Sequence, residues 1–240
     1  MSTASWSDLA ERLDGALSLA TPPLAISFAA EVPDGVQAFD EPMPSPLPDG
    51  RTGRVPAGCV FWIKAAERTF ATVADDHANC SVGSMTHGFK TFDEVAANSD
   101  VAALLDSGWV TVDAVAQIPV VREQPNTVIY GPLAETPVDP DVVFVRLNAK
   151  QLMVLSDAVP GLRIEGKPQC HIVAIAKDQG EVAASVGCAL SRVRTGMAAT
   201  EMTCAIPATK LGEVVAAIER NAVADAAVGR YAAEDAQRFA

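Results

Sequence analysis

The segment CHIVAIAK, residues 170–177, repeats the pattern of CVFWIKAA, residues 59–66, and this repeat decides the fold. Each segment begins at a cysteine and continues as an apolar run. A short strand-like stretch and a turn follow, and the turn ends at a second cysteine, Cys80 in the first copy and Cys188 in the second. The paired cysteines are 21 residues apart in the first copy and 18 in the second. Such self-similarity indicates two related halves.

Hydrophobic periodicity around this repeat predicts a mixed α/β (α+β) fold, in which one unit of two related halves combines a mixed sheet with short helices. Aligning Cys80 with Cys188 brings Gly88 onto Gly196 without a gap, which supports the repeat. The predicted strands cover residues 24–28, 70–73, 127–133, 142–147, 181–186 and 201–207. The predicted helices lie near the N-terminus, after Cys59, from 92 to 105, within 109–121, after Asn148 and from 210 to 222.

The predicted organisation has three parts. They are an N-terminal helix over residues 1–21, one domain over 22–222 with halves at 22–125 and 126–222, and a peripheral tail over 223–240. The proline-rich stretch 32–56 predicts a long covering loop, because a connection of this length in a small domain usually has a functional role.

Composition narrows the classes of partner. The formal charge of −12 argues against nucleic acid and against an anionic membrane surface as partners. No apolar run is long enough to span a bilayer, and the N-terminus lacks the pattern of a secretory signal. We therefore expect a cytoplasmic protein, in which five cysteines are not expected to form a disulfide framework.

The leading functional hypothesis is a metal centre held by Cys59, Cys80, Cys170 and Cys188. Four thiolates suit an iron-sulfur cluster or tetrahedral zinc, and a duplicated fold would supply two from each half. The spacing is unusual for such sites, because the chain contains no CxxC pair. His77, three residues before Cys80, and His171, directly after Cys170, are alternative ligands or ordinary structural histidines.

A second hypothesis is a cysteine-dependent enzyme acting on a small anionic substrate. Cys188 precedes Arg192 and Arg194, whose guanidinium groups would lower the pKa of a neighbouring thiol and bind a carboxylate or phosphate. Cys80 with His87 is the competing nucleophile and base. The two arginines also have an ordinary interpretation, as partners of surface acids.

A third hypothesis is an accessory or binding module whose buried cysteines pack an Ala/Val core. Cys204 belongs to this structural class, because it alternates with Met202 and Ile206 in a predicted strand. The sequence leaves the redox partner and the oligomeric state open.

Several segments together resemble domain-of-unknown-function family 169, also called the ArCR family. The segments are PPLAISF (22–28), NCSVG (79–83), HGFK (87–90), TVIYGPLAE (127–135), PDVVFV (140–145) and RVRTGM (192–197). The resemblance extends from about Leu24 to Ala222. It implies that the places of Cys59, Cys80, Cys170 and Cys188 are special positions, and it implies no activity, because the family is uncharacterised. This chain departs from the family pattern at Ser81 and Val82, where small residues such as Pro and Ala are usual, and in its longer proline-rich loop before Cys59.

Overall fold

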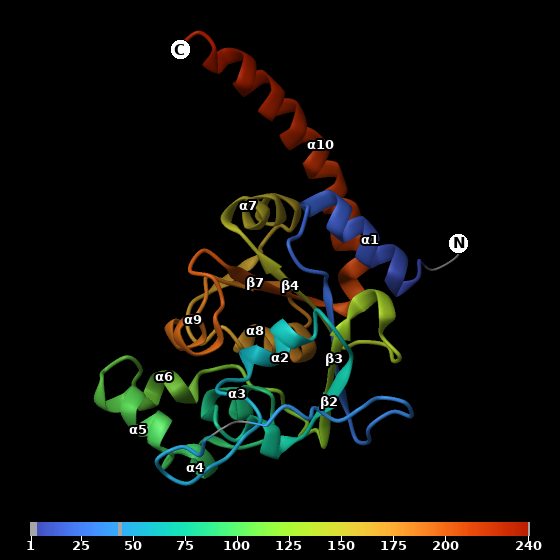
Figure 1. The fold of residues 1–240 in the computed structure, drawn as a ribbon. Coiled ribbons are helices and arrows are strands. Elements are labelled where there is room, and N and C mark those ends of the chain that lie inside the picture. Colours follow the sequence, from blue (N-terminus) through green and yellow to red (C-terminus); the bar gives the residue numbers. More distant parts are fainter. Residues whose placement is uncertain (1–3, 43–44, 240) are drawn as a thin grey trace.

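Within residues 4–42 and 45–239, which are the residues that the computed structural model describes, seven strands form one mixed sheet (Figure 1). The order across the sheet is β2-β3-β1-β4-β7-β6-β5. The strands are β1 (Leu24–Ala29), β2 (Phe70–Thr72), β3 (Thr127–Pro132), β4 (Val142–Leu147), β5 (Arg163–Glu165), β6 (Ala183–Ser185) and β7 (Met202–Pro207). The parts of the predicted terminal segments and covering loop at 1–3, 43–44 and 240 lie outside the described residues.

The strand pairing repeats itself on the two sides of the β1/β4 junction. β1 pairs with β3 over all six residues of each strand, and β4 pairs with β7 in the same way. At the next position outward, Tyr130 of β3 pairs with Phe70 of β2, just as Ala205 of β7 pairs with Ala183 of β6. The predicted fold of two related halves in one α/β unit is therefore confirmed. β5, which the sequence analysis missed, adds a parallel edge strand to the second half alone.

Short helices connect the strands, as expected. They are α1 (Trp6–Leu17), α2 (Cys59–Lys64), α3 (Ser81–Thr86), α4 (Phe92–Val95), α5 (Ser99–Asp106), α6 (Val112–Ala116), α7 (Ala149–Ala158), α8 (His171–Ala174), α9 (Ala189–Thr195) and α10 (Leu211–Ala236). Four single turns accompany them: the 3-10 turns η1 (Ala74–His77), η2 (Leu133–Glu135) and η4 (Ala208–Lys210), and the π turn η3 (Ile175–Gln179).

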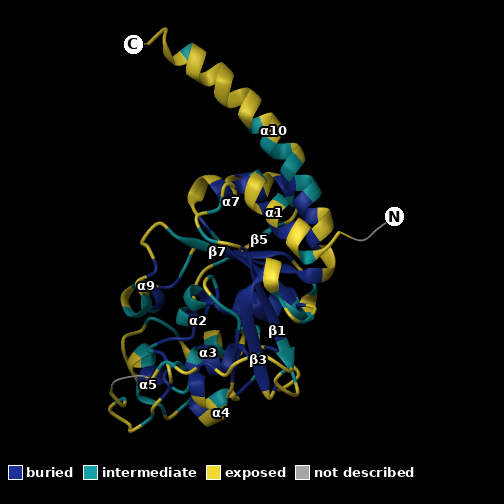
Figure 2. Ribbon diagram, turned by 45° about the vertical axis from the view of Figure 1, so that its right-hand side comes forward, coloured by how far each residue is buried: buried dark blue, intermediate teal, exposed yellow. Residues whose placement is uncertain are grey.

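Two hydrophobic layers enclose the sheet (Figures 1 and 2). α1, α7 and α10 pack on one face, against inward residues such as Ala25 and Val143. α2 and α8 pack on the opposite face, against Ile26, Tyr130 and Phe144. Neighbouring residues of one strand thus pack into different layers, because successive side chains point to opposite faces of the sheet. The second layer is called the cysteine face below, because the four paired cysteines lie on it.

Three local expectations need correction. The helix predicted over 92–105 is two helices, α4 and α5, because Asn98 is extended and starts a new helix. The helix predicted to end at 222 continues to Ala236, and its last turns are exposed (Figure 2). The strand pairing favours a division of the halves between Pro132 and Val142 rather than at 125, because β3 pairs with β1 and β2. Among the described residues, no helix is both long and apolar enough to cross a membrane.

The matched glycines give a test of the repeat. Gly88 and Gly196 both have positive φ angles, 78° and 74°. A side chain at Gly196 would meet nothing within 4 Å, whereas a Cβ at Gly88 would lie 2.7 Å from the backbone oxygen of Val121. We expect Gly196→Ala to lower the free energy of unfolding by about 1–2 kcal/mol, from backbone strain alone. Gly88→Ala should lower it further, because the neighbouring backbone must also move. Urea denaturation of both variants measures the difference, and equal losses would contradict this reading of the two turns.

Candidate functional site

Each of the four paired cysteines stands at the start of a short helix on the cysteine face. Cys59 is the first residue of α2, and Cys80, Cys170 and Cys188 directly precede α3, α8 and α9. α2 of the first half contacts α9 of the second, and α8 of the second contacts α3 of the first. The helix starts therefore meet across the junction of the two halves.

The four thiols are close enough to change one another's pKa values. Burial, followed by the charge of Cys80, raises the pKa of Cys59 to about 12, and Cys188 adds to this increase. Burial also places the pKa of Cys170 well above its ordinary value, and Cys59, Cys80 and Cys188 raise it further. The pKa of Cys80 is raised as well, mainly by burial. Without a cation the pocket thus holds Cys59, Cys80 and Cys170 as neutral thiols.

Hydrogen-bond donors surround the sulfur atoms. The side-chain amide of Gln169 donates to Sγ of Cys59 at 3.3 Å. The backbone N–H of Gly83 donates to Sγ of Cys80 at 3.4 Å, and the N–H of Gly58 also bonds this sulfur. The backbone passes so close to this sulfur that a Cβ at Gly83 would lie 3.0 Å from it. A glycine at position 83 therefore permits the contact.

Within residues 4–42 and 45–239, no three His, Cys, Asp or Glu side chains form a group that could hold one metal ion. The four thiols affect one another's pKa values, and a metal centre shared by them stays a prediction.

Two polar residues that the sequence analysis did not select complete the pocket. The phenol oxygen of Tyr130 is buried next to Cys59 and Cys170, and it has no hydrogen-bond partner among the described residues. The amide oxygen of Gln169 is likewise buried and unpartnered. Buried polar atoms without partners are rare in proteins, and they often mark a missing water, ion or ligand. The position of Gln169 directly before Cys170 is the only sequence signal for either residue.

The histidines of the first half lie beside this pocket. His87 is 2% exposed, and its Nδ1–H donates to the carbonyl of Gly83 at 3.0 Å, which leaves Nε2 as a buried acceptor without a partner in the described chain. His77 contacts the hydroxyl of Thr72 at 3.1 Å through Nε2, and its ring lies 5.7 Å from the ring of His87. Among the described residues no hydrogen bond joins His87 to a cysteine, so its predicted catalytic role stays a prediction.

Two other residues, His171 and Cys204, have different surroundings. Nε2 of His171 is 3.1 Å from a carboxylate oxygen of Glu165, so this ring faces an acid. Cys204 is fully buried in the layer formed by α1, α7 and α10, on the face of the sheet opposite the four cysteines.

The two predicted anion-binding arginines have different surroundings. Arg192 donates three hydrogen bonds to backbone carbonyls, those of Val186, Ala199 and Glu201, at 2.8–3.0 Å. Its guanidinium group therefore fixes the loops around α9. Arg194 has no hydrogen-bond or ion-pair partner within the described ranges, and its charge lowers the pKa of Cys80 against the effect of burial. Of the two, Arg194 has the guanidinium group that is free to meet an anion near the thiols.

The proline-rich segment covers the start of α3, as its length suggested. Arg51 donates to Asp100, to the hydroxyl of Ser81 and to the carbonyl of Ala78, all within 2.8–2.9 Å. The carboxylate of Asp100 in turn accepts the N–H of Ser81 at 3.0 Å. These bonds attach the loop and α5 to the residues on either side of Cys80.

Comparison with known proteins identifies the family. The model of the uncharacterised ArCR family, domain of unknown function 169, matches residues 12–217, so the chain belongs to this family. Searches of curated proteins and of solved structures return no match.

The buried imidazoles predict a loss of stability in mild acid. Burial lowers the pKa of His87 to about 4. An unfolded chain binds this proton near pH 6.5, so the stability contributed at neutral pH is lost progressively as the pH falls from about 6.5 to about 4. In that range His87 should add up to about 1.4 kcal/mol per pH unit to the slope of unfolding free energy against pH. Urea denaturation at pH 7.5, 6 and 5 measures the slope. His87→Gln should reduce it, and an unchanged slope in this variant would show that His87 is protonated in the folded protein.

Proposed function

We propose that this protein binds an iron-sulfur cluster through Cys59, Cys80, Cys170 and Cys188 and uses it as a redox centre. The observation that carries the proposal is the meeting of four thiols, one from each of four helix starts, at the junction of two duplicated halves. Four cysteine thiolates are the usual ligand set of such clusters.

The raised pKa values of the thiols support the binding of a cation among them. Burial and mutual repulsion make it costly to ionise several of these thiols together, as the raised pKa values of Cys59 and Cys170 indicate. Iron would neutralise the thiolates and offset that cost, because a bound metal cation stabilises the deprotonated form.

We prefer a cluster to zinc because the two centres need thiolates at different spacings. A zinc-sulfur bond is about 2.3 Å, so two thiolates on one tetrahedral ion stand about 3.8 Å apart. The described residues contain no group of three suitable side chains with the arrangement that one ion needs. A cluster spans several atoms and accepts thiolates that stand further apart.

The neighbours of the thiols suit redox tuning. Hydrogen bonds to sulfur and nearby charges set the potential of a cluster, and here the N–H of Gly83, the amide of Gln169 and the charge of Arg194 would act on it. Arg194 would also bind a small anionic ligand or an acidic redox partner. All five cysteines are free thiols, which favours a reducing compartment, and we place the protein in the cytoplasm.

The cysteine-dependent enzyme is the weaker alternative. A nucleophilic cysteine needs a lowered pKa, whereas the pKa values of Cys59, Cys80 and Cys170 are all raised. His87 shares no hydrogen bond in the described chain with Cys188 or with Cys80, the two predicted nucleophiles.

Anaerobic purification followed by reconstitution with iron and sulfide tests the proposal. We expect about four iron and four sulfide per chain and a broad visible absorption that bleaches on reduction, as for a cubane cluster. Cys80→Ala and Cys170→Ala, one change in each half, should each reduce iron binding strongly, because each removes a ligand.

Cys204→Ala is the matched control, because it removes a buried cysteine from the opposite face of the sheet. It should leave the iron content unchanged. A protein that stays free of iron and sulfide and keeps its full stability would refute the proposal. Binding of one zinc ion per chain by the four cysteines, without iron, would show that the site is a zinc site instead of a cluster site.

A further inference from the structure

One segment of the first half has no counterpart in the second. After Gly196 the chain reaches β7 through residues 197–201, but after Gly88 it reaches β3 only through residues 89–126. This insertion forms α4, α5 and α6. It is loosely packed: α6 has no buried residue, and Phe92 and Ile118 are only partly buried. A long insertion with exposed apolar side chains beside a candidate site usually has a functional role.

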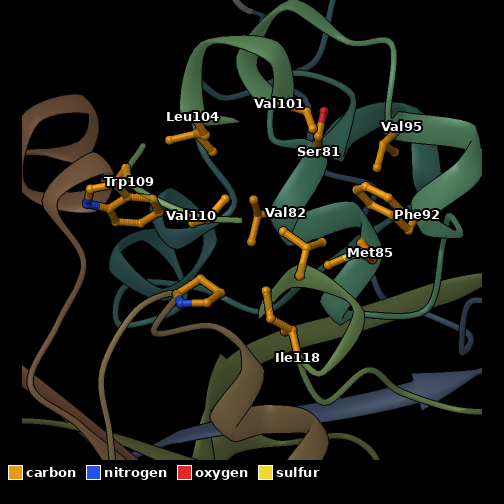
Figure 3. Close-up of a pocket in the computed structure, with 12 residues that line it drawn as sticks. Ser81, Val82, Met85, Phe92, Val95, Val101, Leu104, Trp109, Val110 and Ile118 are labelled. Atoms are coloured by element: carbon orange, nitrogen blue, oxygen red, sulfur yellow. The ribbon is translucent and has the colours of Figure 1, made fainter. Parts of the chain in front are cut away.

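Two neighbouring hollows lie between the insertion and α3. The inner hollow is small, about 20 Å³, and its walls include Val82, Met85, Phe92 and Ile118, which surround it in Figure 3. Its surface is wholly apolar, so water is not favoured there. The outer hollow holds about 380 Å³, the size of a small-molecule site. Met85, Phe92, Val115 and Ile118 belong to both. We call the two neighbouring hollows together the α3–α6 groove.

The mouth of the groove is cationic. Two cations, Arg122 and Lys90, and one carboxylate, Glu94, line the outer hollow. Arg122 is exposed, and its guanidinium group has no ion-pair partner in the described residues, although its backbone N–H holds the carboxylate of Asp178 at 2.7 Å. Lys90 forms an exposed ion pair with Glu94 at 3.3 Å, which is a weak contact. In a chain with a net charge of −12, an apolar groove with an unpaired arginine at its mouth complements an anion with an apolar body.

We propose that the α3–α6 groove binds a small amphipathic carboxylate, with its apolar body between Phe92 and Ile118 and its carboxylate at Arg122. The inner end of the groove reaches Ser81 and Val82, directly after Cys80, and Pro168, two residues before Cys170. The apolar end of the ligand therefore points toward the residues that neighbour Cys80 and Cys170 in the sequence. Only the meaning of this position beside the cysteines rests on the proposed cluster. The groove does not depend on the cluster, because none of the four cysteines lines it.

Binding of octanoate and of its neutral analogue octanamide to the full-length protein tests the groove, by calorimetry or by NMR titration. The titration is run with and without reconstituted iron and sulfide, so that failure of the groove and failure of the cluster are distinguishable. We expect saturable binding of octanoate in both states, several times tighter than binding of octanamide.

Two variants separate the apolar and charged parts of the site. Ile118→Trp fills the groove and should weaken both probes at least about tenfold. Arg122→Gln should weaken octanoate about fivefold and leave octanamide unchanged, because it removes only an exposed charge. The second variant keeps the test valid if the first disturbs the fold, which circular dichroism would show.

Matched controls lie elsewhere on the surface. Val193→Trp adds the same ring to α9, where Val193 is 85% exposed, and Arg220→Gln removes an exposed charge from α10. Both should leave the two affinities unchanged. The proposal is overturned if octanoate does not saturate, if octanamide binds equally well, or if the controls weaken octanoate as much as the groove variants do.

Discussion

The pairing of β1 with β4 is the contact on which the rest of the structure depends. It joins the two halves through only three residue pairs, among them Leu24 with Phe144 and Ile26 with Val142. Side chains complete it. The ring of Trp62, from α2 of the first half, lies 4.3 Å from the ring of Phe144 on β4 of the second, and both are fully buried. Because each half lays a helix across the junction, the two pairs of cysteines arrive on the same face of the sheet.

The meeting of the four cysteines places polar groups in the core, and this lowers the stability of the folded protein. Several groups near the junction are polar and buried, including the thiols of Cys59 and Cys170, the phenol of Tyr130 and Nε2 of His87. An unpaired buried polar atom destabilises a protein by about 1–3 kcal/mol. The opposite layer, around Leu13, Leu155 and Ile218, is almost purely aliphatic and shows what this sheet needs for stability alone. A core that departs locally from that pattern indicates a function that the polar groups serve.

The sequence predicted the parts of this structure that depend on local signals. The spacing of Cys59 and Cys80 against Cys170 and Cys188 indicated the duplication, and Gly88 with Gly196 marked equivalent turns, which both have positive φ. β5 was missed because it has only three residues, two of which, Arg163 and Glu165, are charged, and because it is held by pairing with β6. Tyr130 and Gln169 were missed because their partners are distant in sequence. For Arg192, charge suggested an anion site, but its hydrogen bonds go to carbonyls that only the folded loops bring together.

Each half supplies two of the four paired cysteines, but the residues around the two pairs differ. The strand register makes Ala205 the equivalent of Tyr130, so the second half has no hydroxyl at that place. His77 and His87 both belong to the first half, and their rings pack near Tyr130, 6.4 Å away in each case. The insertion that carries α4, α5 and α6 belongs to the first half as well. A cluster held by the four thiolates would therefore have a phenol and two imidazoles on the side of the first half, and the amide of Gln169 and the guanidinium group of Arg194 on the side of the second. Duplication of one unit accounts for the four paired cysteines, and divergence of the first half accounts for the histidines, the phenol and the insertion on its side.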